Sequence, residues 1–261
     1  MSRPTIFITG AAAGIGRATA ELFASHGWFL GLYDVDESGL RVLQERLGTD
    51  NCIIGKLDTT DVEAYKAALE AFWNAAGLQF NVLFNNAGIA AVGDFESIPL
   101  ERHHRTVAVN LNGVINGCHL ALPYLIRTPD ARVISMCSAS AIYGAPALSV
   151  YSSTKFAIRG LTEALNIEWD HHGVRVMDIM PLFVNTPMVH QFEKKPESAK
   201  NMGVRLSAND IAKVVWKGAT GSAWMTPVHF YPGIQTFLMH LLTKIMPSFL
   251  NRIVYKKVSG Y

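Results

Sequence analysis

The residues with the clearest chemical potential in this chain are a tyrosine, a lysine and a serine. Tyr151 and Lys155 are four positions apart, so a helix would present both side chains on one face. A tyrosine hydroxyl titrates near ~10, too high for proton exchange at neutral pH, and a neighbouring ammonium would lower that pKa. Ser138 could donate a hydrogen bond to a substrate oxygen on which charge develops. The three residues predict acid–base chemistry, with Tyr151 as acid in reduction and as base in oxidation.

A glycine-rich turn follows the first apolar run of the chain and precedes a helical pattern. It consists of Gly10, Ala13, Gly14, Ile15 and Gly16 with two further alanines. Glycine lets the backbone approach a pyrophosphate closely, and the free N–H groups and dipole of a helix N-terminus attract its charge. An ordinary turn is the alternative, but the order strand, turn and helix favours a dinucleotide site.

Acidic residues at the ends of the second and third expected strands bear on the type of cofactor. Asp34 could hydrogen-bond the adenosine ribose and would repel an added 2′-phosphate, while Val35 follows where a cation could have held that phosphate. The nearby cations are Arg17 and Arg41, and we expect Arg17 to face outward. We therefore favour NAD(H) over NADP(H). Asp58 could reach the adenine. As alternatives, Asp34 could be a turn or N-cap carboxylate before the next helix, and Asp58 could cap the helix that starts near Asp61.

Asparagines follow the fourth expected strand and recur in the next helix. Asn86, Ala87 and Gly88 come directly after an apolar run, where an asparagine can lock an irregular backbone and glycine allows close approach of the cofactor. Asn110 lies within an apolar helical pattern, where its amide must be satisfied. A buried asparagine bonded to the backbone is one explanation for Asn110, and a functional role is the other.

The elements that must position these residues alternate along the chain. Expected strands are Thr5–Thr9, Phe29–Asp34, Cys52–Leu57, Phe80–Phe84, Arg132–Cys137, Val174–Met180 and Pro227–Phe230. Expected helices lie near Gly14–His26, Glu37–Leu47, Val62–Ala76, Glu101–Leu125 and Tyr151–His171. Apolar runs without clean alternation suit strands buried on both faces, and repeated strand–helix alternation predicts an α/β fold, a doubly wound parallel sheet with helices on both faces. Ligands bind beyond the carboxyl ends of such strands, which is where the candidate residues fall.

The overall composition sets the remaining bounds. With 49% hydrophobic residues and a formal net charge of +2, the 261-residue chain is expected to form a single globular domain over 1–261 that does not bind nucleic acid. The three cysteines are widely spaced and no metal-ligand cluster occurs, so we expect no metal site and reduced thiols. The first residues lack the pattern of a signal peptide, and we expect a cytoplasmic location.

A Tyr-x-x-x-Lys pair alone is more often an exposed helix pair than a catalytic one. Here it accompanies TGxxxGxG, NNAG, Asn110 and Ser138 in order, and the set resembles the short-chain dehydrogenase/reductase family from Thr5 to about Thr186. The resemblance implies a Rossmann-type fold, nicotinamide dependence and a catalytic tetrad of Asn110, Ser138, Tyr151 and Lys155. It also implies that Asn110 holds a water that links Lys155 to solvent, and that the subunits form homodimers or homotetramers.

The resemblance extends to the loop after the sixth strand, with one departure. The family contacts the nicotinamide there, which implies that Pro181, Val184 and Thr186 contact the cofactor together with Tyr151 and Lys155. Leu182 stands where the family usually has glycine, so the loop beside the nicotinamide is expected to differ in shape.

The loops after strands four, five and six, with a substrate loop or lid over about 182–206, are expected to bind the substrate. Their side chains are mostly apolar: Ala90, Ala91, Val92, Ala139, Ile142, Tyr143, Leu182, Phe183, Met188 and Phe192. We therefore expect an apolar alcohol or carbonyl substrate. The alternative is that these residues pack on the protein itself.

The segment 233–261 is strongly apolar and forms a helical stripe through Ile234, Leu238, Leu241, Ile245 and Phe249. It is too interrupted to span a membrane. Packing on the core, on a partner subunit or as a lid is the favoured explanation. Peripheral contact with an anionic lipid surface through nearby lysines and arginines is the alternative.

The sequence thus predicts an oxidoreductase that moves a hydride between NAD(H) and an alcohol or carbonyl carbon. The first alternative is a catalytically idle NAD(H)-binding sensor or scaffold, against which Tyr151 and Lys155 are both intact. The second is a relative that performs epimerisation or dehydration, which usually needs a longer substrate-binding region than this chain offers.

Overall fold

Seven short apolar runs form one parallel sheet in the computed structural model, which describes residues 3–190, 192, 196–222 and 226–261. The strands are β1 (Thr5–Thr9), β2 (Phe29–Asp34), β3 (Cys52–Lys56), β4 (Val82–Asn85), β5 (Arg132–Met136), β6 (Arg175–Ile179) and β9 (His229–Phe230). Their order is β3-β2-β1-β4-β5-β6-β9. The expected doubly wound α/β fold is therefore confirmed, with strand ends that differ from the expected ones by two residues at most.

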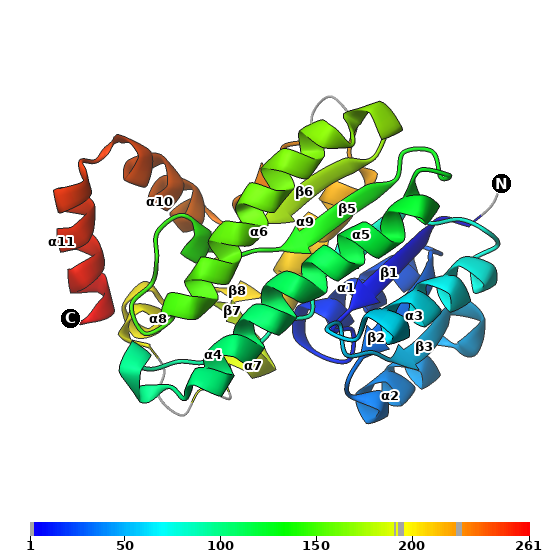
Figure 1. Cartoon of the computed structure of the whole chain (residues 1–261), viewed down its shortest axis with the longest axis horizontal. Helices are drawn as coiled ribbons and strands as arrows, with labels where there is room; N and C mark the ends of the chain where they lie inside the picture. Colours follow the sequence, from blue (N-terminus) through cyan, green and yellow to red (C-terminus); the bar gives the residue numbers. More distant parts are fainter. Residues whose placement is uncertain (1–2, 191, 193–195, 223–225) are drawn as a thin grey trace.

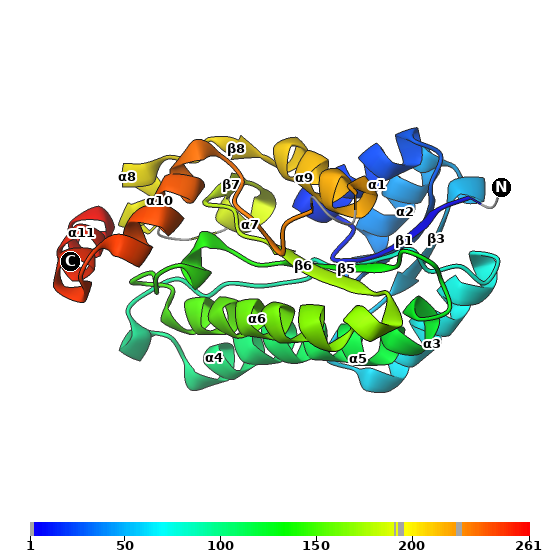
Figure 2. The same cartoon turned by 90° about the horizontal axis from the view of Figure 1, so that it is seen from above.

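The sheet is the middle one of three layers (Figure 2). One face is covered by α3 (Val62–Ala75), α4 (Leu100–Val107), α5 (Gly113–Leu125) and α6 (Ser149–Glu168). The other face is covered by α1 (Gly14–Ser25), α2 (Glu37–Leu47) and α9 (Ala208–Thr220). Each face has its own apolar core, and all five residues of β1 and of β5 are buried. Burial on both faces explains why these strands are continuous apolar runs.

The order of the strands has a switch point between the neighbouring strands β1 and β4. It builds β2 and β3 on one side of β1, and then returns to place β4, β5 and β6 on the other side. A ligand crevice forms at such a switch point, because the loops after the two strands leave in opposite directions. The glycine turn follows β1 and Asn86 follows β4, so both candidate segments meet there.

Two helical regions differ from expectation. The single helix expected over Glu101–Leu125 is divided into α4 and α5 by a π-helical turn at Ala108–Asn112. Helix α9 was not expected, although it begins at a capping box in which Ser207 and Asp210 exchange hydrogen bonds with each other's backbone. Helix α9 packs against α1 on the sheet surface, and its Ile211, Val215 and Ala219 belong to the apolar core of that face.

Short elements lie between β6 and β9 and after β9. They are β7 (Val184–Asn185), α7 (Pro187–His190), α8 (Glu197–Met202), β8 (Leu206–Ser207), α10 (Ile234–Ile245) and α11 (Ser248–Ser259), and β7 pairs with β8. The expected continuous helical stripe is broken before Pro247, which is the N-cap of α11. Helices α10 and α11 lie at the end of the molecule farthest from the N-terminus (Figure 1). Among the described residues, no helix is long and apolar enough to cross a membrane.

Candidate active site

The glycine turn after β1 has the backbone shape that the sequence indicated. Gly10 and Gly14 have φ angles of +66° and +55°, a region that other residues adopt at a cost. A Cβ on Gly16 would lie 2.0 Å from the carbonyl oxygen of Gly10, so no side chain fits there. Gly10, Ala13, Gly14 and Ile15 line the main cavity, whereas Gly16 does not and serves the close packing of the turn on α1.

Asn86 fastens the glycine turn to the end of β4. Its Nδ2 donates to the carbonyl oxygens of Thr9 and Gly10, each at 3.0 Å. The Thr9 hydroxyl in turn accepts from the backbone N–H groups of Asn86 at 3.0 Å and Ala87 at 3.1 Å. Asn86, Ala87 and Gly88 all line the cavity. The role of the Thr9 side chain was missed from the sequence, although its position directly before the glycine turn was the available signal.

Asp34 lies at the carboxyl end of β2 and lines the same cavity. Its two carboxylate oxygens accept hydrogen bonds from the backbone of Ala12 at 3.0 Å and of Asp36 at 3.1 Å. The carboxylate is thereby held beside the glycine turn. The N-cap of α2 is Asp36, which accepts from Gly39, so Asp34 is not the helix cap. Its hydrogen bond from the Asp36 backbone does make it a turn carboxylate, the other alternative, in addition to lining the cavity.

Asp58 has a partner that the sequence did not reveal. It pairs with Arg105 of α4 at 2.7 Å and accepts from Thr60, and Asp61 is the N-cap of α3. Burial raises the pKa of Asp58, but the hydrogen bonds from Arg105 and Thr60 outweigh that effect and the net pKa is lowered. Both Asp58 and Arg105 line the cavity. The sequence indicated only Arg17 and Arg41 as cations near Asp34. Arg105 was missed because it is distant in sequence from β2.

Asn110 lies in the π-helical turn and is fully buried. Its Oδ1 accepts from the Ile89 backbone N–H at 2.8 Å, and its Nδ2 donates to the Ile89 carbonyl oxygen at 2.9 Å. A weaker hydrogen bond of 3.4 Å reaches the Thr154 hydroxyl on α6. Asn110 does not line the cavity; it connects the loop after β4 to α6, and single-turn π-helices of this kind are often found at functional sites.

Ser138, Tyr151 and Lys155 meet at one place in the cavity. Ser138 follows β5, Tyr151 lies in the first turn of α6, and a hydrogen bond joins their hydroxyls. The Lys155 ammonium lies 5.4 Å from the centre of the Tyr151 ring and donates to the Met136 carbonyl oxygen at 2.8 Å. The arrangement places a serine hydroxyl, a tyrosine hydroxyl and a buried lysine side by side.

The electrostatics of this group differ from expectation in one respect. We expected Lys155 to lower the pKa of Tyr151, but burial raises it to about 12, and only the hydrogen bond with Ser138 lowers it. Burial lowers the pKa of Lys155, while Cys137 and Asp178 raise it. The reason is the direction of the Lys155 ammonium, which points to the Met136 carbonyl. At neutral pH Tyr151 is therefore protonated and able to donate.

The loop after β6 returns to the glycine turn. Pro181 accepts a hydrogen bond of 2.8 Å from Ala139, and Val184 is buried as part of β7. A Cβ on Gly14 would lie 3.4 Å from the Thr186 methyl, so this loop and the turn are nearly in contact. Pro181, Leu182, Val184 and Thr186 all line the cavity. Leu182, at the position of the missing glycine, also packs on the apolar core.

The cavity has a volume of about 370 Å³, within the range of small-molecule sites. Its charged described residues, Asp34, Asp58, Arg105 and Lys155, belong to the glycine-turn side and the catalytic group. The rest of its wall is mainly apolar and includes the expected Ala90, Ala139, Tyr143, Leu182, Phe183, Met188 and Phe192. The expected Ala91, Val92 and Ile142 do not line it. Part of the expected lid, residues 191 and 193–195, lies outside the described residues.

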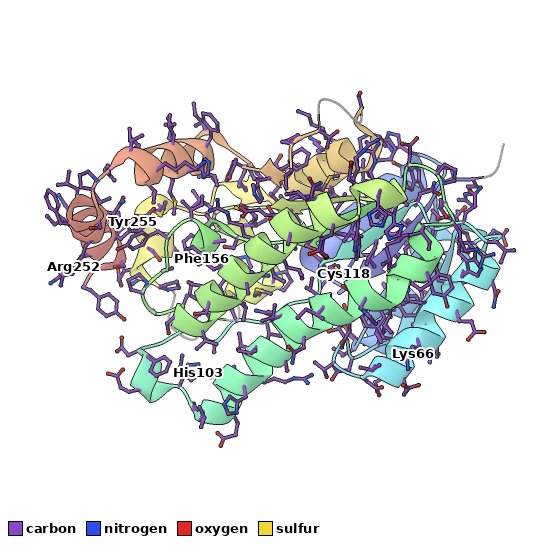
Figure 3. The ribbon with its side chains drawn as sticks, turned by 45° about the horizontal axis from the view of Figure 1, so that its top comes forward. Lys66, His103, Cys118, Phe156, Arg252 and Tyr255 are labelled. Carbon is purple, nitrogen blue, oxygen red and sulfur yellow. The ribbon has the colours of Figure 1, made fainter. Side chains whose placement is uncertain are left out.

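The C-terminal helices add residues to the cavity that sequence reasoning did not assign. Met239 of α10 and Tyr255 and Val258 of α11 line it. Tyr255 stacks on Tyr143 with ring centres 3.8 Å apart, and its hydroxyl bonds Thr243 at 3.0 Å. Figure 3 shows Tyr255 on the side of α11 that faces the body of the molecule. The apolar tail is thus part of the site.

A glycine cradle beside a fixed carboxylate, opposite a Ser–Tyr–Lys group, fits a nicotinamide dinucleotide, and comparisons with known proteins agree with this class. The family model of short chain dehydrogenases matches residues 4–197. Cyclohexanol dehydrogenase of Acinetobacter sp. is 30% identical over 190 residues, covering 72% of this chain and 75% of that protein. The putative oxidoreductase SadH of Mycobacterium tuberculosis is 31% identical over 268 residues, covering 97% of this chain and 95% of that protein.

Solved structures show the same architecture. The 3-ketoacyl-(acyl-carrier-protein) reductase of Brucella melitensis, complexed with NADH, superposes with a TM-score of 0.79 at 26% identity, covering 87% of this chain and 95% of that one. The chain belongs to the short-chain dehydrogenase/reductase family and is an oxidoreductase. Among the described residues, no group of His, Cys, Asp and Glu could hold a metal ion.

Proposed function

We propose that the protein is an NAD(H)-dependent dehydrogenase or reductase that acts on an apolar alcohol or ketone, with Tyr151 as the general acid and base. One observation carries the proposal. Ser138, Tyr151 and Lys155 share a single cavity with the glycine turn and Asp34, and the remaining described wall of that cavity is mainly apolar.

The preference for NAD(H) is supported by Asp34. Its carboxylate is fixed by two backbone donors beside the glycine turn, where it can accept hydrogen bonds from ribose hydroxyls. A 2′-phosphate would meet this negative charge, and Arg105, the described arginine that lines the cavity on that side, is already paired with Asp58. The relative solved with NADH is consistent with this preference.

The chemistry divides between cofactor and protein. Bound nicotinamide supplies or accepts the hydride. Tyr151, protonated at neutral pH, donates its proton to the carbonyl oxygen in reduction, and Ser138 stabilises the charge on that oxygen with a hydrogen bond. In oxidation the Tyr151 phenolate takes the substrate proton, and the Lys155 ammonium would stabilise that phenolate once it turns from the Met136 carbonyl toward it. Asn110 positions the loop after β4 and, by the family resemblance, holds a water that leads protons away from Lys155.

An apolar substrate is supported by the wall opposite the cofactor side. Leu182, Phe183, Met188, Met239 and Val258 offer no group that could bind a phosphate or carboxylate. Because α10 and α11 contribute to this wall, we propose that the chain acts as one catalytic domain. We also propose a cytoplasmic homodimer or homotetramer, in keeping with its free, buried cysteines and the habits of its family.

The first experiment measures NADH and NADPH binding by fluorescence, followed by turnover with a panel of apolar ketones and secondary alcohols. Tyr151→Phe should bind NADH as the wild type does but lose turnover by at least about a hundredfold, because it lacks the transferable proton. Tyr143→Phe is the matched control, since Tyr143 lines the same cavity outside the catalytic group. Its turnover should change by less than about threefold.

The outcomes separate the proposal from its alternative. NADPH preference would overturn the role given to Asp34. Cofactor binding without turnover on any substrate would favour a sensor or scaffold on the same fold. Turnover that survives in Tyr151→Phe would overturn the acid–base role.

A further inference from the structure

Helix α10 has its polar and apolar faces reversed relative to an ordinary surface helix. The side toward the protein carries Thr236, which is 1% exposed and donates to the Pro232 carbonyl oxygen at 2.7 Å, and His240, which stacks on Tyr231. The outward side is apolar and consists of Ile234, Phe237, Leu238, Leu241, Leu242 and Ile245. Ile234 and Ile245 are 76% and 70% exposed. The stripe therefore does not pack on the core of its own chain, and packing on a partner subunit or contact with a lipid surface remain as the expected roles.

Helix α11 continues the apolar surface. Phe249, Leu250, Ile253 and Val254 are exposed on it, with Phe249 at 62%. Both helices stand next to each other at one end of the molecule (Figures 1 and 2), and each carries exposed apolar side chains. Exposed apolar side chains that gather on two adjacent helices mark a binding surface, because scattered single residues would be ordinary.

The charge of the segment indicates what covers this surface. Residues 234–261 contain no Asp or Glu but include Lys244, Arg252, Lys256 and Lys257. All four cations are exposed, and none forms an ion pair with a residue in the described part of the chain. Figure 3 shows Arg252 on the outer side of α11. Apolar side chains flanked by unpaired cations match an anionic lipid surface, where the chains enter the acyl boundary and the cations meet the headgroups.

A second copy of the chain fits this surface less well. In a two-fold dimer the same patch faces itself, so the four unpaired cations of one subunit would approach those of the other. Like charges opposed across an interface are unfavourable. An anionic bilayer offers both an apolar interior and neutralising charge.

We propose that α10 and α11 form a peripheral membrane-binding surface for anionic lipids. The two helices lie in the plane of the interface, and neither spans it. Since Met239, Tyr255 and Val258 on their inner sides line the cavity, binding would place that wall next to the bilayer, where apolar molecules concentrate. The binding itself does not depend on the proposed activity.

The test is flotation of the full-length protein with vesicles of 30% phosphatidylglycerol and 70% phosphatidylcholine, compared with pure phosphatidylcholine. The wild type should float with the anionic vesicles and lose binding at high salt. Removing one cation with Lys256→Gln should weaken partition about fivefold at low ionic strength. Ile245→Asp and, separately, Phe249→Asp should weaken it at least about tenfold.

The matched control is Ile167→Asp on α6, because Ile167 is also an exposed isoleucine, at 78%, but lies away from the patch. It should float as the wild type does. NADH binding and thermal unfolding establish that each variant is folded, independently of turnover. Wild type that fails to float, or Ile245→Asp and Phe249→Asp variants that float normally, would overturn the proposal. A dimer that Ile245→Asp dissociates, without vesicle binding, would assign the surface to a second copy.

Discussion

Tyr151 shows how burial and partners set the state of a single residue. Burial raises its pKa to about 12, and the hydrogen bond with Ser138 lowers it only in part. The neutral hydroxyl is the form that reduction requires, so the free protein is prepared to donate a proton. To act as the base in oxidation Tyr151 must first lose its proton, and the phenolate then needs additional positive charge, which the Lys155 ammonium would supply on turning from the Met136 carbonyl toward it.

At the residue scale, we predict that Asp34 determines the preference for NADH over NADPH. Asp34→Ala should reduce the ratio of kcat/KM for NADH to kcat/KM for NADPH by about 10- to 100-fold, because a charged hydrogen-bond acceptor is worth about 1.5–3 kcal/mol. Steady-state kinetics with both cofactors measures the ratio. Asp36→Ala is the control: it removes an equal charge nearby, but from the N-cap of α2. An equal change in the two variants would mean that overall charge, and not Asp34, sets the preference.

At the scale of elements, the junction of β1 and α1 depends on Gly16. Gly16→Ala places a Cβ 2.0 Å from the Gly10 carbonyl oxygen, so the turn must open. We expect a loss of about 1–3 kcal/mol in the free energy of unfolding, together with weaker NADH binding. Urea denaturation measures the first effect. Gly160→Ala in α6 meets nothing within 4 Å and should leave stability equal or slightly higher. Equal stability of the two variants would contradict the packing role.

A partly buried cluster, with Asp178 fully buried and Glu163 exposed, joins β6, β9 and α6 and makes stability depend on pH. His229 bonds both carboxylate oxygens of Asp178 at 3.0 Å and Glu163 at 3.1 Å, with Arg159 nearby. Burial lowers the pKa of His229, but Asp178 outweighs this and the net pKa is raised; burial also raises the pKa of Asp178. Groups with raised folded pKa values stabilise the protein below their unfolded values and lose that contribution as pH rises through the folded values.

The free energy of unfolding of the wild type should therefore fall as pH rises above 6.5, by no more than about 1.4 kcal/mol per pH unit for one proton. Burial raises the pKa of Glu163, but Arg159 and His229 outweigh this and the net pKa is lowered. Glu163 therefore reduces the free energy of unfolding only as pH falls into the acid range. The double variant Asp178→Asn, His229→Gln keeps the shape but cannot titrate, and its profile should be flatter over the same range. Chemical denaturation between pH 6 and 9 compares them. Parallel profiles would rule out the cluster as the source.

The elements also show where the sequence was sufficient and where it was not. The strands, the glycine turn and the Ser138–Tyr151–Lys155 group depend on local patterns and short spacings, and the structure brings them together as expected. Arg105 and the cavity residues of α10 and α11 join the site through tertiary packing, which no local pattern records. The direction of the Lys155 ammonium and the exposure of Ile234 and Ile245 likewise depend on what surrounds them.

At the scale of the whole molecule, the C-terminal helices α10 and α11 contribute both to the wall of the cavity and to the exposed apolar patch. The family model ends at residue 197, so α10 and α11 lie beyond the part that defines the family. Their inner sides close the cavity through Met239 and Tyr255, and their outer sides carry the apolar patch with its cations. The same segment can thus determine which substrate fits and where the enzyme meets it.

Substrate choice by this segment can be measured with a series of unbranched secondary alcohols. Each added CH₂ that reaches the apolar wall is worth about 0.8 kcal/mol, so kcat/KM should rise about fourfold per carbon until the cavity is filled. Met239→Asn should flatten this dependence, because it places an amide in the wall. Leu238→Asn makes the same kind of change one residue earlier, on the exposed side of α10, and should leave it unchanged. If both variants retained the wild-type dependence, longer substrates would have to extend away from α10, and the wall formed by the C-terminal helices would not select them.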